Sequence, residues 1–156
     1  MYRKMTHLNF EHMKKSFFVA LMAMVCSLSA CADDQLVAFA QLPAPAQNTV
    51  KQYFDEANIA FCTLDREFLG KEYKVQFNDG SEIKFEGDGS LHNVDCKFRA
   101  VPDALVPEIV RQQVKASFPQ AVIVEWGKDD WGWKAELSNQ LELKFNSKYQ
   151  MTGVDD

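Results

Sequence analysis

The chain has 156 residues, of which 47% are hydrophobic and 25% are charged, and its net charge is −5. This composition is typical of a globular protein with one ordinary domain or two very small ones. An N-terminal leader, described next, holds four of the 17 basic and one of the 22 acidic residues, so a net charge of −8 remains on the rest. Because this remainder is acidic and its lysines alternate with glutamates, we expect no nucleic-acid partner.

Residues 1–31 are expected to be a signal peptide, with Met13 as an alternative start. Lysines precede an apolar run from Phe17 to Val25, which is too short for a permanent transmembrane helix but typical of a secretory signal. The run ends in Leu-Ser-Ala before Cys31, which resembles a bacterial lipobox, so we expect Cys31 to be acylated. The alternative is ordinary cleavage after Ala32, because small residues also occupy the positions that this cleavage requires.

Residues 32–41 are expected to be a tether or a stray edge segment. A helix should follow, because Pro43 and Pro45 are tolerated in a first helical turn. Beyond them Val50, Phe54 and Ala57 fall on one side at helical spacing, which predicts an amphipathic helix with a single buried stripe.

A β-hairpin is predicted for residues 73–85, where apolar and polar residues alternate about a turn at residues 78–80. The same pattern returns sixty residues later, over residues 133–145. Residues that match at this offset are Lys74 with Lys134, Glu82 with Glu142, Lys84 with Lys144 and Phe85 with Phe145. We therefore predict a tandem repeat.

The second unit is predicted to begin with a helix of its own. Pro107 stands at a first-turn position and Pro119 ends the helix. The residues expected on its apolar side are Ile109, Val110, Val114 and Phe118. Each unit, residues 42–98 and 99–156, therefore reads as a helix and four strands. The predicted fold is α+β, with one curved antiparallel eight-stranded sheet and both helices on one face.

The apolar phase of the strands is predicted to lie under the helices as one core. Its members are Leu64, Tyr73, Val75, Phe77, Ile83, Phe85, Val94, Val122, Val124, Trp131, Trp133, Ala135, Leu137, Leu143, Phe145 and Val154. The opposite phase is charged and faces water. Phe61 falls outside the apolar phase, so we expect it on the charged face.

Two cysteines remain beyond the leader, Cys62 and Cys96. Export favours a disulfide between them. In a simple meander, however, the first and fourth strands lie about 14 Å apart, which is too far for a disulfide. Two buried thiols are the expectation, and a disulfide is the alternative.

The order of these motifs resembles the PepSY-like proteins, which are grouped with the beta-lactamase inhibitory protein as small exported bacterial proteins. Residues 73–85 and 101–119 carry the likeness most clearly, and it extends over residues 42–156. The first unit departs from the pattern at Asn58-Ile59, where the second has Phe118-Pro119. The resemblance implies a curved eight-stranded sheet with two helices on its convex side, and it implies a function only loosely.

The sequence contains no catalytic constellation. His92 is the one histidine beyond the leader, so it cannot form a histidine-based metal site or dyad by itself. Asp88 and the pair Asp129-Asp130 have the positions of turn formers. Since no phosphate loop, nucleophile elbow or zinc spacing appears, we expect neither an enzyme nor a cofactor.

The leading functional hypothesis is a non-catalytic binding module, lipid-anchored in the periplasm or outer membrane, that holds or inhibits another envelope protein. The lipid would be its only contact with the membrane. The candidate residues lie on the charged face and are Lys74, Gln76, Lys84, Lys134, Glu136 and Lys144. The alternative for these residues is a solvated face that only keeps the sheet soluble. The second hypothesis is a carrier or sensor with a small-ligand groove between the units, near Trp126, Asp129 and Trp131.

Overall fold

The structure, a computed structural model, describes residues 34–67 and 70–156. The predicted signal peptide and Cys31 lie outside these residues. The helices are α2 (Ala44–Tyr53) and α3 (Glu108–Ser117), with short 3-10 helices η1 (Phe39–Gln41), η2 (Glu56–Asn58) and η3 (Asp103–Leu105). The strands are β1 (Gln35–Val37), β2 (Ile59–Glu67), β3 (Gly70–Phe77), β4 (Glu82–Glu86), β5 (Leu91–Asp95), β6 (Ile123–Asp129), β7 (Gly132–Leu137), β8 (Glu142–Phe145) and β9 (Met151–Asp155).

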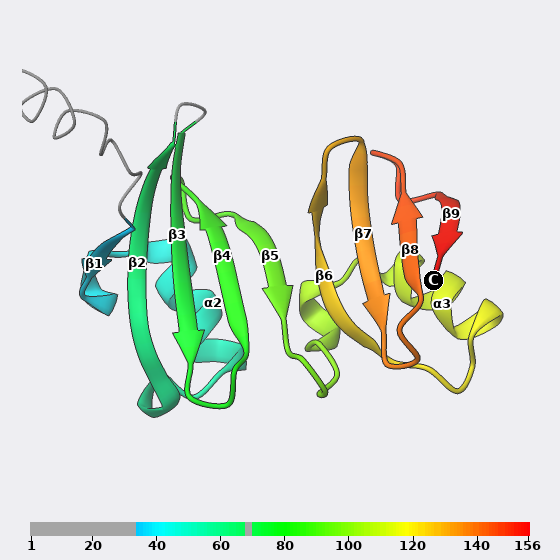
Figure 1. The fold of residues 1–156 in the computed structure, drawn as a ribbon, viewed down its shortest axis with the longest axis horizontal. Helices are drawn as coiled ribbons and strands as arrows, with labels where there is room; N and C mark the ends of the chain where they lie inside the picture. The colour runs from blue at the N-terminus through cyan, green and yellow to red at the C-terminus, as the bar shows by residue number, and fades with distance from the viewer. Residues whose placement is uncertain (1–33, 68–69) are drawn as a thin grey trace, which may run out of the picture. The chain divides into compact units, whose positions relative to one another are not determined.

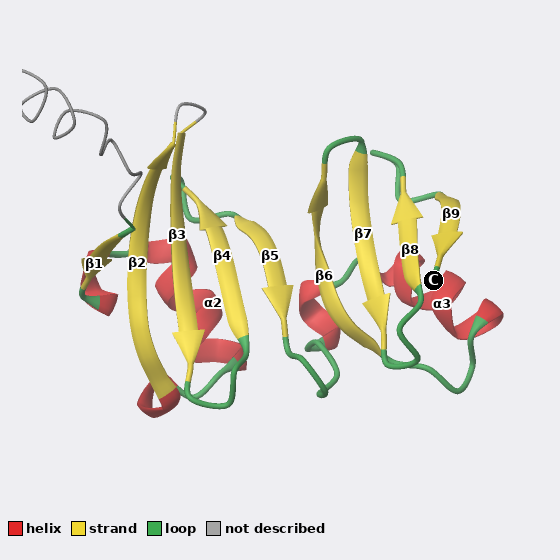
Figure 2. Cartoon of the chain, viewed as in Figure 1, coloured by secondary structure: helices red, strands yellow, loops and turns green. Residues whose placement is uncertain are grey.

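The strands form one open sheet in chain order from β1 to β9, and every neighbouring pair is antiparallel. Both helices lie on the same face of this sheet (Figures 1 and 2). The α+β class and the single antiparallel sheet are therefore confirmed. A helix followed by four strands occurs twice in this order, while the origin of the two units as copies of one another stays a prediction.

The sheet has nine strands and not the eight that we predicted. The additional strand, β1, lies within the segment expected to be a tether or a stray edge segment. It pairs with the outer edge of β2, where Val37 lies opposite Cys62. A three-residue edge strand is stabilised by main-chain hydrogen bonds and needs no alternating pattern, and Leu36 is indeed 72% exposed. The sequence therefore carried no periodic signal for it.

The two helices begin next to prolines, as predicted, with Pro43 and Pro107 at their N-caps. α2 ends earlier than expected, because Phe54 already has an extended backbone. Ala57 consequently lies in η2, where it is exposed, and does not belong to the buried stripe. Ile109 is also exposed, since α3 presents only the narrow stripe around Val110 to the sheet.

One hydrophobic core joins both helices to the sheet. Ala46 and Val50 of α2 and Val110 and Val114 of α3 belong to the same buried cluster as the inward residues of the strands. No helix among the described residues combines the length and the apolar character needed to cross a membrane.

Three residues predicted for the core are instead exposed: Val122, Trp131 and Val154. A β-bulge between Ile123 and Glu125 changes the alternation, so Ile123 turns inward and Val122 outward. Trp131 lies in the turn before β7, where no strand neighbour covers it, and is 90% exposed. Val154 is aligned with core residues but belongs to the edge strand β9.

Both cysteines are buried free thiols, which confirms the expectation and excludes the alternative disulfide in this structure. Cys62 lies on β2 and Cys96 directly follows β5, so β3 and β4 separate them in the sheet. Burial raises the pKa of Cys62 and raises that of Cys96 to about 11. Both side chains are therefore protonated and unreactive at neutral pH.

Candidate binding face

The sheet face opposite the helices carries a cationic row, which we define as Lys74, Lys84, Lys134 and Lys144. Lys74 of β3 lies directly opposite Lys84 of β4, and Lys134 of β7 lies directly opposite Lys144 of β8. On β5 and β6, the two strands between these pairs, the residues in register with the lysines are Asn93 and Gly127. The cationic row therefore crosses the sheet with a neutral centre.

An acidic row runs beside the cationic row, two residues further along the strands. Each of the six strands from β4 to β9 contributes one carboxylate, and each carboxylate lies opposite the next. Its members are Glu82, Asp95, Glu125, Glu136, Glu142 and Asp155.

Strand alternation explains why both rows face away from the helices. On each strand from β4 to β8, one residue separates the two rows, and this residue is buried in the core. These residues are Ile83, Val94, Trp126, Ala135 and Leu143. Because successive side chains point to opposite faces of a sheet, their neighbours on either side point outward. The two rows thus belong to one rigid surface, supported from behind by the core.

Like charges directly opposite one another destabilise a strand pair by about 0.2–1 kcal/mol. On this face, diagonal ion pairs between lysines and carboxylates offset this repulsion. The Lys134 ammonium lies 3.2 Å from a Glu125 oxygen and 3.8 Å from a Glu142 oxygen. The Lys144 ammonium lies 2.5 Å from an Asp155 oxygen. Lys84 lies 3.9 Å from Glu82 and, on its other side, 3.7 Å from Glu72. Each of these lysines is therefore the counter-ion of the carboxylates beside it.

Carboxylate neighbours raise the pKa of the two lysines contributed by β7 and β8. Partial burial by itself lowers the pKa of Lys134, but Glu125 and Glu142 outweigh it, and the net pKa is raised above the usual lysine value. A hydrogen bond to Asp155 raises the pKa of Lys144. Lys134 and Lys144 therefore hold their charges over the whole physiological pH range.

The neutral centre of the cationic row depends on one glycine. Asn93 donates a hydrogen bond of 2.8 Å from Nδ2 to Oε1 of Glu125, and its side chain lies across Gly127. A Cβ atom at Gly127 would come within 2.4 Å of Asn93 Nδ2. Glycine at position 127 therefore leaves room for the Asn93 side-chain amide, which links β5 to Glu125 of the acidic row.

All six predicted site residues lie on this surface. The four lysines form the cationic row, and Glu136 belongs to the acidic row without an ion pair among the described residues. Gln76 extends the acidic row by one strand, lying opposite Glu82. Its side-chain amide donates to the Ser81 main-chain oxygen at 2.9 Å, so Gln76 primarily stabilises the β3–β4 turn.

Five residues of the acidic row were not among the predicted site residues: Glu82, Asp95, Glu125, Glu142 and Asp155. Alternation already indicates their face, since each lies next to a residue of the predicted apolar phase. Only the pairing of the strands shows that they form one continuous row. Phe61, expected on this face, is partly exposed.

His92 belongs to a separate cluster beyond the cationic row. Its Nδ1 lies 2.9 Å from an oxygen of Glu86, and the Lys128 ammonium lies 2.8 Å from the same carboxylate. The hydrogen bonds from Lys128 and His92 lower the pKa of Glu86. No group of three or more potential metal ligands with a suitable arrangement occurs among the described residues.

Trp126, one of the three residues predicted to lie near a groove between the units, is not available to a ligand. It is only 1% exposed, and its ring stacks on Trp133 at a centroid distance of 5.1 Å inside the core. Trp131 lies in the turn before β7 and is exposed.

The family model described as "Putative beta-lactamase-inhibitor-like, PepSY-like" matches residues 71–152. Among solved structures, a "putative calcium-regulated periplasmic protein" from Bacteroides thetaiotaomicron is 32% identical, with a TM-score of 0.74 over 80% of this chain and 98% of its own. A "putative periplasmic protein" from Bacteroides vulgatus is 29% identical, with a TM-score of 0.77 over 81% of this chain and 100% of its own. Among curated proteins, none matches this chain.

The family match covers more than half of the chain, and the structural likeness covers 80% of it. The resemblance of the two hairpins and the Pro107 helix to this family is therefore confirmed. The chain belongs to the PepSY-like, beta-lactamase-inhibitor-like family.

Proposed function

We propose that this protein is a non-catalytic, exported module that holds or inhibits another envelope protein through the two charged rows. In this proposal a lipid on Cys31 tethers the module to the membrane. The description of two relatives as periplasmic supports an exported location.

The arrangement of like charges is the observation that carries this proposal. A surface selected only for solubility and stability would place opposite charges across each strand pair. Here Lys74 faces Lys84, Lys134 faces Lys144, and six carboxylates stand side by side. Such separated rows produce a patterned potential, which can orient a charged partner during association.

The charge balance of the two rows indicates the chemistry of the partner. Six carboxylates lie beside four lysines, and Glu136 has no cation of its own among the described residues. A partner with a basic stripe over the acidic row and carboxylates over the lysines would be complementary. Arginine suits this role because its planar guanidinium can bind two carboxylate oxygens at once.

A pull-down from envelope extract tests the proposal. We compare the wild type with a Lys84→Gln, Lys134→Gln double variant. Glutamine is preferable to glutamate here, because glutamate would add two further negative charges beside the carboxylates that lose their lysine partners. The matched control is Lys51→Gln with Lys148→Gln, two exposed lysines outside the rows that give the same change in net charge.

We expect a partner that is captured by the wild type and by the control, and is lost with the row variant. Thermal unfolding of all three proteins shows whether the fold is retained. Equal capture by the two double variants would show that the rows do not bind the partner, and the face would then serve only to keep the sheet in solution.

A further inference from the structure

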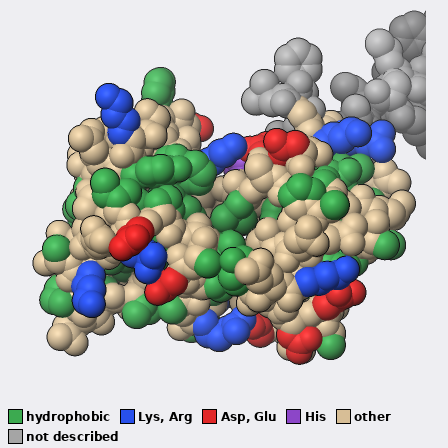
Figure 3. Space-filling model, turned by 180° about the vertical axis from the view of Figure 1, so that it is seen from behind, with side chains coloured by type: hydrophobic (Ala, Val, Ile, Leu, Met, Phe, Trp, Pro, Cys, Tyr) green, Lys and Arg blue, Asp and Glu red, His purple; other side chains and the backbone are tan. Residues whose placement is uncertain are grey.

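A hollow lies on the other side of the sheet from the charged rows, where the chain passes from β5 to α3. It is a cavity of about 350 Å³, at the small end of the range for ligand pockets. Its floor is formed by the core residues Val101, Val106 and Ile123, and Val122 stands exposed at the rim. Seen from the helix side, apolar side chains lie among scattered charges (Figure 3).

The main-chain groups of Val101 and Val122, which border this hollow, already have partners. The Val101 N–H donates to the Ile123 carbonyl at 2.8 Å. Val122 donates to the Ser138 hydroxyl at 3.2 Å, and its carbonyl accepts from the Ser138 N–H at 2.8 Å. These segments therefore offer no free edge to an extended peptide, which would need main-chain hydrogen bonds.

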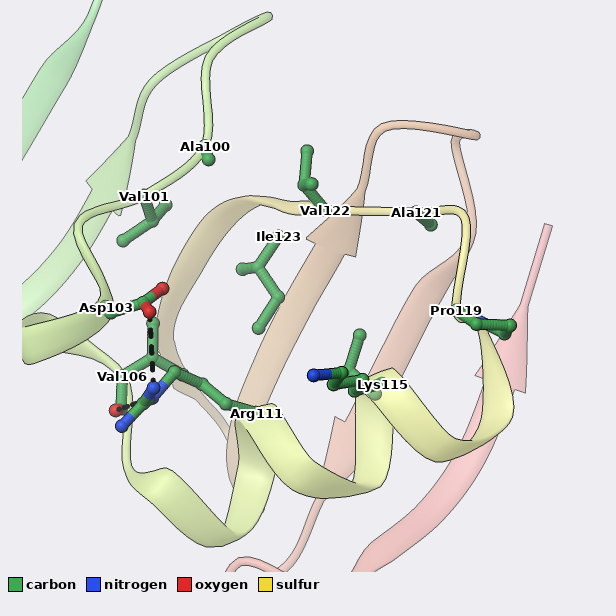
Figure 4. A pocket seen from close by; sticks show the side chains of 11 residues that line it. Ala100, Val101, Asp103, Val106, Arg111, Lys115, Pro119, Ala121, Val122 and Ile123 are labelled. Carbon is green, nitrogen blue, oxygen red and sulfur yellow. Dashed lines mark hydrogen bonds and ion pairs between the residues drawn. The ribbon is translucent and has the colours of Figure 1, made fainter.

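One wall of the hollow is cationic. Arg111 of α3 donates to Asp103 and to the Val106 carbonyl, both at 3.3 Å, so its charge is compensated. Lys115, one helical turn later, makes no such contact among the described residues. Figure 4 shows its ammonium on the side of α3 that faces Val122 and Ile123. An apolar hollow with one uncompensated cation is thus present on an otherwise acidic protein.

We propose that this hollow binds an aliphatic carboxylate of the fatty-acid type. The carboxylate would lie at Lys115, and the hydrocarbon chain would cover Val122 and Ile123. The residues that line the hollow include no aromatic side chain, so a sugar or another planar ring would find no stacking surface. The site lies on the face opposite the charged rows, and the proposal does not depend on them.

Calorimetric titration of the purified protein with octanoate tests this site, with octanol and octylamine as ligands that lack the carboxylate. Three variants accompany it. Lys115→Gln removes the cation, and Val122→Asp places a negative charge on the exposed rim. Lys148→Gln is the control, since this exposed lysine lies in the β8–β9 turn. Thermal unfolding shows that each variant is folded.

We expect saturable binding of octanoate that is about tenfold weaker in Lys115→Gln and in Val122→Asp, because each variant loses or opposes one charge-assisted contact. Lys148→Gln should bind as the wild type does. Amide shifts of Val122 and Ile123 on titration would place the ligand. Equal affinity for octanol, or an equal loss in Lys148→Gln, would overturn the proposal. The proposal would also be overturned if the protein bound a peptide with an aliphatic C-terminus but did not bind octanoate.

Discussion

Gly127 is a residue whose size matters on the charged face, because the Asn93 amide occupies the space where its side chain would be. Overpacking of this kind costs about 1–3 kcal/mol. We therefore expect Gly127→Ala to lower the free energy of unfolding by an amount in this range, measured by urea denaturation.

Gly153 provides the matched control, since it stands at the same level of the sheet on β9. A Cβ atom there would meet Lys144 Cβ only at 3.9 Å, an ordinary contact. Gly153→Ala should therefore leave the unfolding midpoint nearly unchanged. Equal midpoints for the two variants would mean that Asn93 moves aside and that its bond to Glu125 is not structural.

The two tryptophans of β6 and the following turn should respond in opposite ways to truncation. Trp126→Ala removes a buried ring and is expected to lower the free energy of unfolding by about 3–5 kcal/mol. Trp131→Ala affects an exposed side chain and should change it by less than about 0.5 kcal/mol. Urea denaturation of both variants checks this. A large loss with Trp131→Ala would contradict its position on the surface.

At the scale of elements, one cluster joins three strands: Glu86 of β4 contacts His92 of β5 and Lys128 of β6. Since the pKa of Glu86 is lowered in the folded protein, the contribution to stability is present above the usual glutamate pKa of about 4.3. It is lost as the pH falls through the lowered folded pKa. The group is about one third exposed, so solvent screening limits the contribution to at most about 1 kcal/mol.

Glu86→Gln should therefore be less stable than the wild type at pH 7, and the difference should disappear as the pH is lowered to about 3. Urea midpoints at a series of pH values measure it. Glu56→Gln, at an exposed position in η2, should show no such convergence. A difference that stays constant with pH would show that the charge of Glu86 is not responsible.

The elements that could be predicted from the sequence are those with local signals. Alternation predicted the two hairpins, and Pro45 and Pro107 marked the first turns of the helices. β1 has no such signal, because three residues cannot show a period. The exposure of Val122 was also not predicted, because a bulge depends on how β6 pairs with β7 and not on either strand alone.

The same distinction applies to the candidate site. The lysines of the cationic row lie within the hairpins, so their common face followed from alternation. The junction between Asp95 of β5 and Glu125 of β6 joins residues from different halves of the chain, and only the register of this strand pair brings them together. The continuity of the acidic row across six strands is therefore a tertiary property.

At the scale of the whole molecule, the proposed partner binding should depend on ionic strength. The rows are partly exposed to solvent, and the screening length falls from about 10 Å at 0.1 M salt to about 3 Å at 1 M. Capture from envelope extract should accordingly decline as salt is raised. Capture that is unchanged at 1 M salt would indicate an apolar contact, for which the exposed Trp131 would be the first residue to substitute.

The bulge in β6 places the two proposed sites next to one another along one strand. Ile123, on the floor of the α3 hollow, and Glu125, in the acidic row, flank the same irregular step. If a ligand in the hollow shifts Ile123 and with it Glu125, it changes the affinity of the acidic row for a protein partner. The partner then changes the affinity of the hollow for the ligand by the same factor.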